Sequence, residues 1–125
     1  MIHHVSFGTR DAAKAKAFYD PVLAVVGWRC IQSNDRAVDY GVSEIMFSLE
    51  TPVDGGEATA GNGAHVAFVA RDRATVDAFF RTALEQGGTD AGAPGVRAQY
   101  DPNYYGAFVR DLDGNKIEAM TFAAT

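Results

Sequence analysis

The chain has 125 residues, of which 47% are hydrophobic and 22% are charged, and its formal net charge is −5. This length and composition predict one compact globular domain whose core needs no disulfide, in agreement with a single cysteine, Cys30. The acidic balance argues against a nucleic-acid partner, and no apolar run or secretory signal indicates a membrane or export, so we expect a cytoplasmic protein.

The first nine residues after Ile2, HHVSFGTRD, predict a strand followed by a helix. Val5 and Phe7 alternate with smaller residues, which is typical of a half-buried strand, and Asp11 stands where a helix N-cap is expected. Apolar residues then recur at helical spacing and form one stripe: Ala15, Phe18, Tyr19, Val22 and Leu23. Because proline removes a backbone hydrogen bond, we expect this helix to end or kink at Pro21.

The same pattern returns 61 residues later, beginning with AHVAFVARD. Over the 24 positions from His4 to Gly27, the shifted chain matches itself at ten, where ordinary composition gives roughly one or two. The second copy repeats the cap as Asp72 and the helical stripe as Val76, Phe79, Phe80, Ala83 and Leu84. Two copies of one supersecondary unit are the simplest explanation.

Each helix is followed by shorter strand candidates. These are 28–32, 37–41 and 44–49 in the first copy, and a stretch near Arg97, then 104–110 and 116–122, in the second. Asp113-Gly114 predicts a hairpin between the last two strands. The unit is therefore β-α-β-β-β. The segment 90–103 is expected to be irregular, as an ordinary loop or as a flap that contacts substrate.

We predict a single α+β domain over residues 1–125. Module one spans about 1–52, a glycine-rich connector too polar to join the core spans about 53–63, and module two spans about 64–125. One helix on a sheet leaves the other sheet face uncovered. The two modules are therefore expected to form a curved mixed sheet around a central cleft, with the helices outside.

The strand alternation places three potential metal ligands on the cleft side. If Val5 and Val66 pack under the helices, their neighbours His4 and His65 must face the cleft. In the last strand, Glu118 lies between two apolar residues and has the same orientation, and a buried carboxylate is costly without a compensating charge. Each residue alone also fits a structural or solvent-exposed role, and His3 is expected to be structural or exposed.

Two imidazoles and one carboxylate suit a divalent ion. Fe, Mn, Ni, Co and Zn all accept such ligands, and three protein ligands leave coordination positions open for Lewis-acid chemistry on a substrate oxygen. Glu118 is the first candidate catalytic residue. If the hairpin loop has an even length, Tyr105 shares a face with Glu118 and is the second candidate, or else it fills the rim of the core. The general base is not identified.

Three segments, IHHVSF, GAHVAFVARD and FVRDLDGNKIEAM, resemble the vicinal oxygen chelate superfamily, which includes glyoxalase I, fosfomycin-resistance transferases, extradiol dioxygenases and bleomycin-binding proteins. The resemblance covers nearly the whole chain. It implies the glyoxalase-like fold of paired β-α-β-β-β modules, a metal-bearing cleft and a homodimer, with His4, His65 and Glu118 as the metal ligands. Whether the modules pair within one chain or are exchanged between two chains stays open.

One departure bears on activity. Glyoxalase I uses a fourth ligand, a glutamate from the other module, and superposing SEIMFSLE on NKIEAMTF puts Met46 or Ser48 there. A three-ligand site is therefore expected, as in the transferases and dioxygenases. The sequence predicts a small metal-dependent enzyme that chelates vicinal oxygens of a small-molecule substrate. The alternative is a non-catalytic drug- or metabolite-binding protein of the bleomycin-resistance type.

Overall fold

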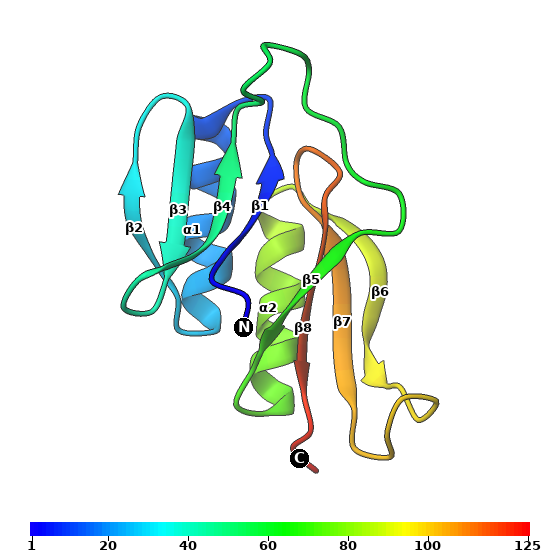
Figure 1. Ribbon diagram of the computed structural model, residues 1–125. Helices are drawn as coiled ribbons and strands as arrows, with labels where there is room; N and C mark the ends of the chain where they lie inside the picture. The colour runs from blue at the N-terminus through cyan, green and yellow to red at the C-terminus, as the bar shows by residue number, and fades with distance from the viewer.

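A computed structural model describes residues 1–125 as two successive β-α-β-β-β units (Figure 1). The first contains β1 (Val5–Gly8), α1 (Ala12–Val25), β2 (Arg29–Ser33), β3 (Ala37–Gly41) and β4 (Ile45–Glu50). The second contains β5 (His65–Val69), α2 (Arg73–Glu85), β6 (Thr89–Val96), β7 (Tyr105–Arg110) and β8 (Lys116–Thr121). The strand orders are β1-β4-β3-β2 and β5-β8-β7-β6, and in each sheet the first pair is parallel. The α+β class is confirmed.

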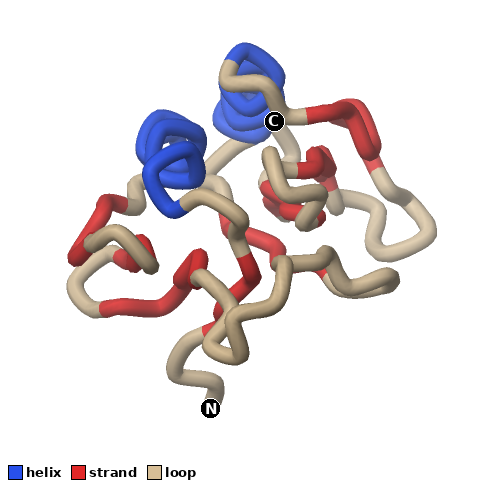
Figure 2. The backbone as a smooth tube through the Cα atoms, turned by 90° about the horizontal axis from the view of Figure 1, so that it is seen from above, coloured by secondary structure: helices blue, strands red, loops and turns tan.

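The two helices cover one side of both sheets and leave the other side open. Viewed from above, α1 and α2 lie next to each other on one side of the strands (Figure 2). Strands β1 and β5 are edge strands that each pair with one neighbour only, so the sheets are open. Neither helix has the length and apolar character needed to cross a bilayer.

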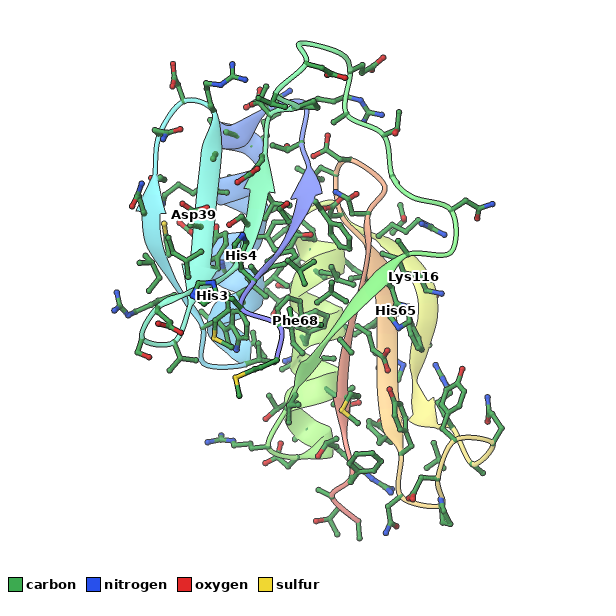
Figure 3. All side chains as sticks on the ribbon, in the orientation of Figure 1. His3, His4, Asp39, His65, Phe68 and Lys116 are labelled. Carbon is green, nitrogen blue, oxygen red and sulfur yellow. The ribbon has the colours of Figure 1, made fainter.

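One hydrophobic core joins the two units. The rings of Phe47 on β4 and Phe68 on β5 meet edge to face with centroids 5.3 Å apart, and Phe68 lies at the junction between the units (Figure 3). Phe68 also contacts Phe79 of α2. All five predicted stripe residues of α1 are buried, whereas Leu84 of the α2 stripe is 38% exposed. The shared core explains why neither unit has to fold alone.

The helix starts were predicted correctly, but α1 does not end at Pro21, one of the two outcomes predicted for it. Asp11 accepts a hydrogen bond from the Lys14 backbone N–H at 3.0 Å, and Asp72 accepts one from Thr75 at 2.8 Å. Helix α1 continues through Pro21 to Val25. Because Val22 and Leu23 beyond the proline are fully buried, their burial offsets the lost backbone hydrogen bond.

Two segments expected to be irregular or detached are ordered. Strand β6 occupies 89–96 and so overlaps the first part of the stretch 90–103 that was predicted to be irregular, and it ends just before Arg97, near which a strand was predicted. Its ladder with β7 shifts register on both sides of Gly92. The irregular pairing hides the strand alternation from the sequence. In the connector, Ala58 is 3% exposed and packs against Gly8, so this loop does contribute to the buried interior.

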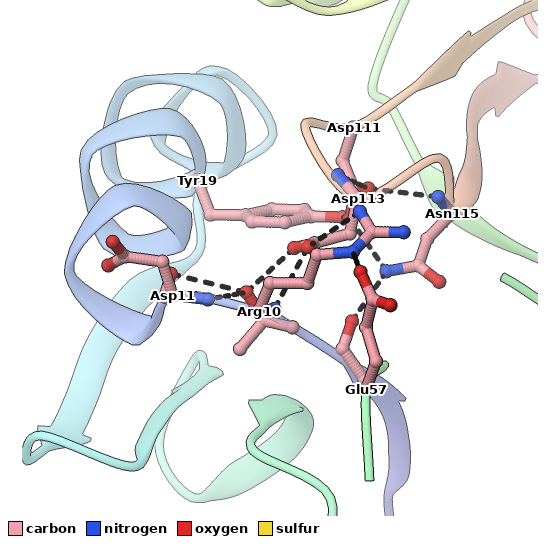
Figure 4. Close-up of polar contacts among 9 residues, drawn as sticks. Arg10, Asp11, Tyr19, Glu57, Asp111, Asp113 and Asn115 are labelled. Carbon is pink, nitrogen blue, oxygen red and sulfur yellow. Dashed lines mark hydrogen bonds and ion pairs between the residues drawn. The ribbon is translucent and has the colours of Figure 1, made fainter. Parts of the chain in front are cut away.

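The predicted hairpin joins β7 and β8 and is held by a buried polar network (Figure 4). Asp111 accepts hydrogen bonds from the Tyr19 hydroxyl at 2.6 Å, from the backbone N–H groups of residues 113 and 115, and from the Asn115 side chain. Burial raises the pKa of the Asp111 carboxyl, and these hydrogen bonds oppose that rise. Asp113 in turn accepts from the Thr9 hydroxyl at 2.6 Å, so the hairpin is tied to the start of α1.

Candidate functional site

The main cavity is a pocket of about 520 Å³ over the open face of the second sheet. Every strand of that sheet contributes to it, together with the loop between β6 and β7. Its lining residues are His65, Ala91, Gly92, Arg97, Tyr100, Tyr104, Phe108, Lys116 and Glu118. Within one chain, the pocket therefore lies over module two, whereas the sequence predicted a cleft between the two modules.

Glu118 is the buried polar group of this pocket. Its neighbours Ile117 and Ala119 belong to the hydrophobic core, whereas Glu118 lines the pocket on the other face, so the predicted alternation of β8 is confirmed. The Glu118 side chain is 1% exposed, and its Oε1 lies 3.2 Å from Nε2 of His65. Its other oxygen, Oε2, accepts a hydrogen bond from the Tyr104 hydroxyl. The carboxylate thus has a different partner on each oxygen.

Tyr104 is a site residue that the sequence reasoning missed. It precedes β7 on the same face as Phe108, which pairs directly with Glu118 across the ladder. Burial, followed by the hydrogen bond to Glu118, raises the pKa of Tyr104 well above the ordinary tyrosine value, so the phenol keeps its proton at neutral pH. Gly106 leaves room for the pair, because a Cβ there would crowd both partners, at 3.0 Å from Oε2 of Glu118 and 3.2 Å from the Tyr104 ring.

Tyr105 packs at the rim of the core, as the alternative interpretation predicted, and does not share a face with Glu118. The loop between Arg110 and Lys116 has five residues, an odd number, so Tyr105 pairs with Thr121 and faces the helix side of the sheet. Its hydroxyl donates to Asp77 of α2 at 2.6 Å, and that hydrogen bond is the main cause of the raised pKa of Tyr105. Tyr105 therefore does not line the pocket. An odd loop length would have pointed to Tyr104 instead.

His4 is separate from the other two predicted ligands within the chain. It precedes β1, is exposed, and lies by the first sheet, whereas His65 lies over the second (Figure 3). The Nδ1 atoms of His3 and His4 are 2.9 Å apart, and His3 is exposed as expected. No group of three or more His, Cys, Asp or Glu side chains in one chain is arranged to hold a metal ion.

The first sheet carries a serine at the position equivalent to Glu118. Ser6 pairs with Ser48 as Ala67 pairs with Glu118, so Ser48 is the counterpart and Met46 is not. Across the ladder from Ser48 is Asp39, a half-buried carboxylate on the open face. The sequence reasoning did not single out Asp39, although its place between buried Val38 and Tyr40 marks that face.

Comparisons with known proteins point to one family. Residues 1–119 match the model of the Glyoxalase/Bleomycin resistance protein/Dioxygenase superfamily. A crystal structure of a glyoxalase/bleomycin resistance protein from Albidiferax ferrireducens T118 is similar at 35% identity and a TM-score of 0.86, covering 95% of this chain and 96% of that one. Comparison with proteins of curated function gives no match.

More distant structures share the fold. A glyoxalase/bleomycin resistance protein/dioxygenase family enzyme from Burkholderia phytofirmans PsJN has 19% identity and a TM-score of 0.77, covering 98% of both chains. A glyoxalase-related enzyme from Fulvimarina pelagi has 18% identity and a TM-score of 0.76, covering 97% of this chain and 87% of that one.

Proposed function

Because the chain belongs to the Glyoxalase/Bleomycin resistance protein/Dioxygenase superfamily, we propose that it is a small metal-dependent enzyme that acts on a small-molecule substrate. Its reaction class is that of the lyases, transferases or dioxygenases of this superfamily. The proposed metal ligands are His4, His65 and Glu118. The observation that carries the proposal is a carboxylate with 1% exposure beside an imidazole at the base of an open pocket.

The donor set fits a divalent cation of the Fe, Mn, Ni, Co or Zn type. His65 and Glu118 lie together within one chain and offer one nitrogen and one charged oxygen, a combination that these ions accept. A bound divalent ion would act as a Lewis acid on substrate oxygens. It would also balance the negative charge of Glu118, whose partners within the chain are the His65 imidazole and the Tyr104 hydroxyl.

The third ligand is proposed to come from a second copy of the chain. His4 is exposed and precedes an edge strand whose outer side has no partner, and β5, which begins at His65, is the corresponding edge of the other sheet. A twofold-symmetric homodimer that joins β1 of one copy to β5 of the other would place His4 of a second copy near His65 and Glu118. The same dimer would have two equivalent sites.

Tyr104 is proposed to hold a proton at the site. Its phenol stays protonated at neutral pH and donates to Oε2 of Glu118. The hydroxyl can keep Glu118 oriented, or it can turn its proton toward a substrate oxygen that enters the pocket. Tyr104 thus takes the catalytic place that was expected for Tyr105.

One observation favours a second function, a non-catalytic protein that binds a drug or metabolite. Both oxygens of Glu118 have partners within the chain, since His65 lies beside Oε1 and the Tyr104 hydroxyl donates to Oε2. Tyr100, Tyr104 and Phe108 also give the pocket the aromatic walls typical of small-molecule sites. Such a protein would bind its ligand equally well with and without a chelator.

Elemental analysis of protein purified without chelator tests the proposal. Metal should be present near one ion per chain in the wild type, and it should be lost in His4→Ala, His65→Ala and Glu118→Gln. His3→Ala is the matched control, because it removes the adjacent exposed imidazole and should keep the metal. Circular dichroism establishes that each variant is folded. A folded wild type that stays metal-free after incubation with each candidate ion would favour the binding function instead.

A further inference from the structure

We propose that the pocket selects a small planar molecule carrying one anionic group, which Arg97 and Lys116 bind. This inference names the substrate class of the site described above, and it rests on the proposed function for the identity of that site. It starts from two cationic side chains in the pocket that have no acidic partner in the chain.

Arg97 and Lys116 both lie against the ring of Phe108. The Arg97 guanidinium carbon is 5.6 Å from the ring centroid, and the Lys116 ammonium nitrogen is 4.8 Å from it. Neither side chain forms an ion pair, although acidic residues outnumber Lys and Arg by 16 to 11 in the sequence. The one carboxylate of the pocket, Glu118, is engaged by other groups. This end of the pocket therefore has uncompensated positive charge, which favours an anion.

The backbone of β6 positions the guanidinium. Nη2 of Arg97 donates to the Ala93 carbonyl at 2.8 Å, which leaves the other guanidinium N–H groups free to bind an anion. Glycines give it room, because a Cβ would lie 3.3 Å from Nη2 at Gly92 and 3.2 Å from Nη1 at Gly95. A side chain at either position would crowd the guanidinium and require it to shift. The arginine is thus oriented before any ligand arrives.

The remaining walls suit a flat molecule. Tyr100 and Tyr104 meet edge to face at 5.1 Å, and Tyr100 is 63% exposed, so part of its ring is free for contact. His65 packs edge to face on Phe108 at 5.9 Å. Aromatic walls favour a planar ligand through stacking or edge contacts. A volume of about 520 Å³ lies in the range of small-molecule sites.

The distance between the cationic residues and the proposed metal ligands matches the size of a small molecule. Lys116 and Glu118 are two residues apart on the same face of β8, a separation of about 7 Å along a strand. Lys116 also pairs with His65 in the parallel ladder. A single-ring anion held by Arg97 and Lys116 would therefore present its other substituents to His65, Glu118 and Tyr104.

Binding of benzoate, with benzamide as its neutral isostere, tests the inference by isothermal titration or by chemical-shift changes. In chelator-treated protein, benzoate should bind at least about tenfold more tightly than benzamide, since hydrogen bonds to charged groups have this magnitude. Cyclohexanecarboxylate, which keeps the charge and lacks the flat ring, should bind several-fold more weakly than benzoate. Equal binding of benzoate and benzamide would overturn the inference.

Two pairs of variants locate the effect. Arg97→Gln and Lys116→Gln should each weaken benzoate binding by about tenfold and weaken benzamide binding much less, because benzamide carries no charge. Arg81→Gln and Lys14→Gln remove the same charges from exposed helix positions outside the pocket and should have no effect. If the helix variants lose as much benzoate binding as the pocket variants, the overall charge of the protein explains the effect, and the inference is overturned.

The metal-free measurement separates this inference from the proposed function. Selective benzoate binding by a protein that takes up no metal would leave the anion site standing and reject the metal-dependent enzyme. Stoichiometric metal in a protein that does not distinguish benzoate from benzamide would do the reverse.

Discussion

Glu118 is a carboxylate that the fold buries and then surrounds with partners. Its oxygens contact a half-exposed imidazole and a phenol, and the glycine at position 106 provides the space for this contact. A buried carboxylate without partners would lose several kcal/mol of solvation, about what an unpaired buried charge costs in proteins. Tyr104 therefore contributes to stability as well as to the proposed chemistry.

Replacement of Tyr104 by Phe should lower the free energy of unfolding by about 1 to 2 kcal/mol, because Glu118 loses its hydroxyl donor and stays buried. Tyr100→Phe, at an exposed tyrosine of the same pocket whose hydroxyl makes no hydrogen bond within the chain, should change it by less than about 0.5 kcal/mol. Urea titration of both variants measures the difference. Equal stability of the two would show that Glu118 does not depend on Tyr104.

At the scale of residues, strand alternation was enough to predict that His65 and Glu118 share a face. That inference is local, because neighbouring side chains in a strand point to opposite faces whatever the sheet does. Which of Tyr104 and Tyr105 faces Glu118 could not be predicted from local alternation. It depended on whether the hairpin loop has an odd or even number of residues, and the Asp113-Gly114 turn alone does not fix that number.

Among the secondary-structure elements, the β7–β8 hairpin has the most extensive polar anchoring. Asp111 accepts four hydrogen bonds, one of them from Tyr19 of α1, and the Asn115 amide donates to the Gly8 carbonyl at 2.9 Å. The network connects the hairpin of the second unit to β1 and α1 of the first. It therefore fixes how the strand bearing Glu118 lies relative to module one.

Asp111→Ala should lower the free energy of unfolding by about 3 kcal/mol, because buried donors from the backbone, Tyr19 and Asn115 lose their acceptor. Asp101→Ala is the matched control, since Asp101 accepts one turn hydrogen bond from the Asn103 N–H in an exposed loop. The control should lose less than about 1 kcal/mol. Thermal and urea unfolding give both values, and a loss for Asp111→Ala no greater than for the control would contradict the anchoring role.

Pro21 is a local cost inside α1. Restoring the backbone N–H and removing the ring clash in Pro21→Ala should raise the free energy of unfolding by roughly 1 kcal/mol or more. The reverse change in α2 is Thr82→Pro, at the position equivalent by the 61-residue repeat, and it should destabilise by about 3 kcal/mol. Thermal unfolding tests both signs. A less stable Pro21→Ala variant would mean that α1 is adapted to its proline.

The elements illustrate why sequence patterns succeed or fail. Both helix caps and most of both buried stripes were predictable, because capping and amphipathicity depend on residues within a few turns of each other. Strand β6 was misplaced because its partner shifts register around Gly92, so alternation is interrupted. The length of α1 was underestimated because tertiary burial outweighs the local effect of proline.

For the whole molecule, the internal repeat predicted two like units, and the family resemblance agrees with the comparisons. The sequence could not determine how the units are placed, since this depends on contacts between residues far apart in the chain. The single chain joins them through the two helices and a shared aromatic core, and it leaves both sheets open. That arrangement separates His4 from His65, which is why the proposed site needs two copies.

The proposed homodimer makes a distinctive prediction for mixed variants. The His4→Ala and His65→Ala variants should each still form dimers. Neither dimer has a site with all three ligands, so neither should bind metal. In an equimolar mixture that has been allowed to exchange subunits, half of the dimers contain one chain of each kind. One site of each mixed dimer then combines the intact His4 of one chain with the intact His65 of the other.

The measurement that tests the account most directly is therefore the metal content of this mixture, compared with the two separate variants and the wild type. The account predicts recovery of about a quarter of the wild-type sites, since half of the dimers are mixed and one of their two sites is complete. No recovery in a mixture whose subunits have been shown to exchange would contradict a metal site shared between two chains.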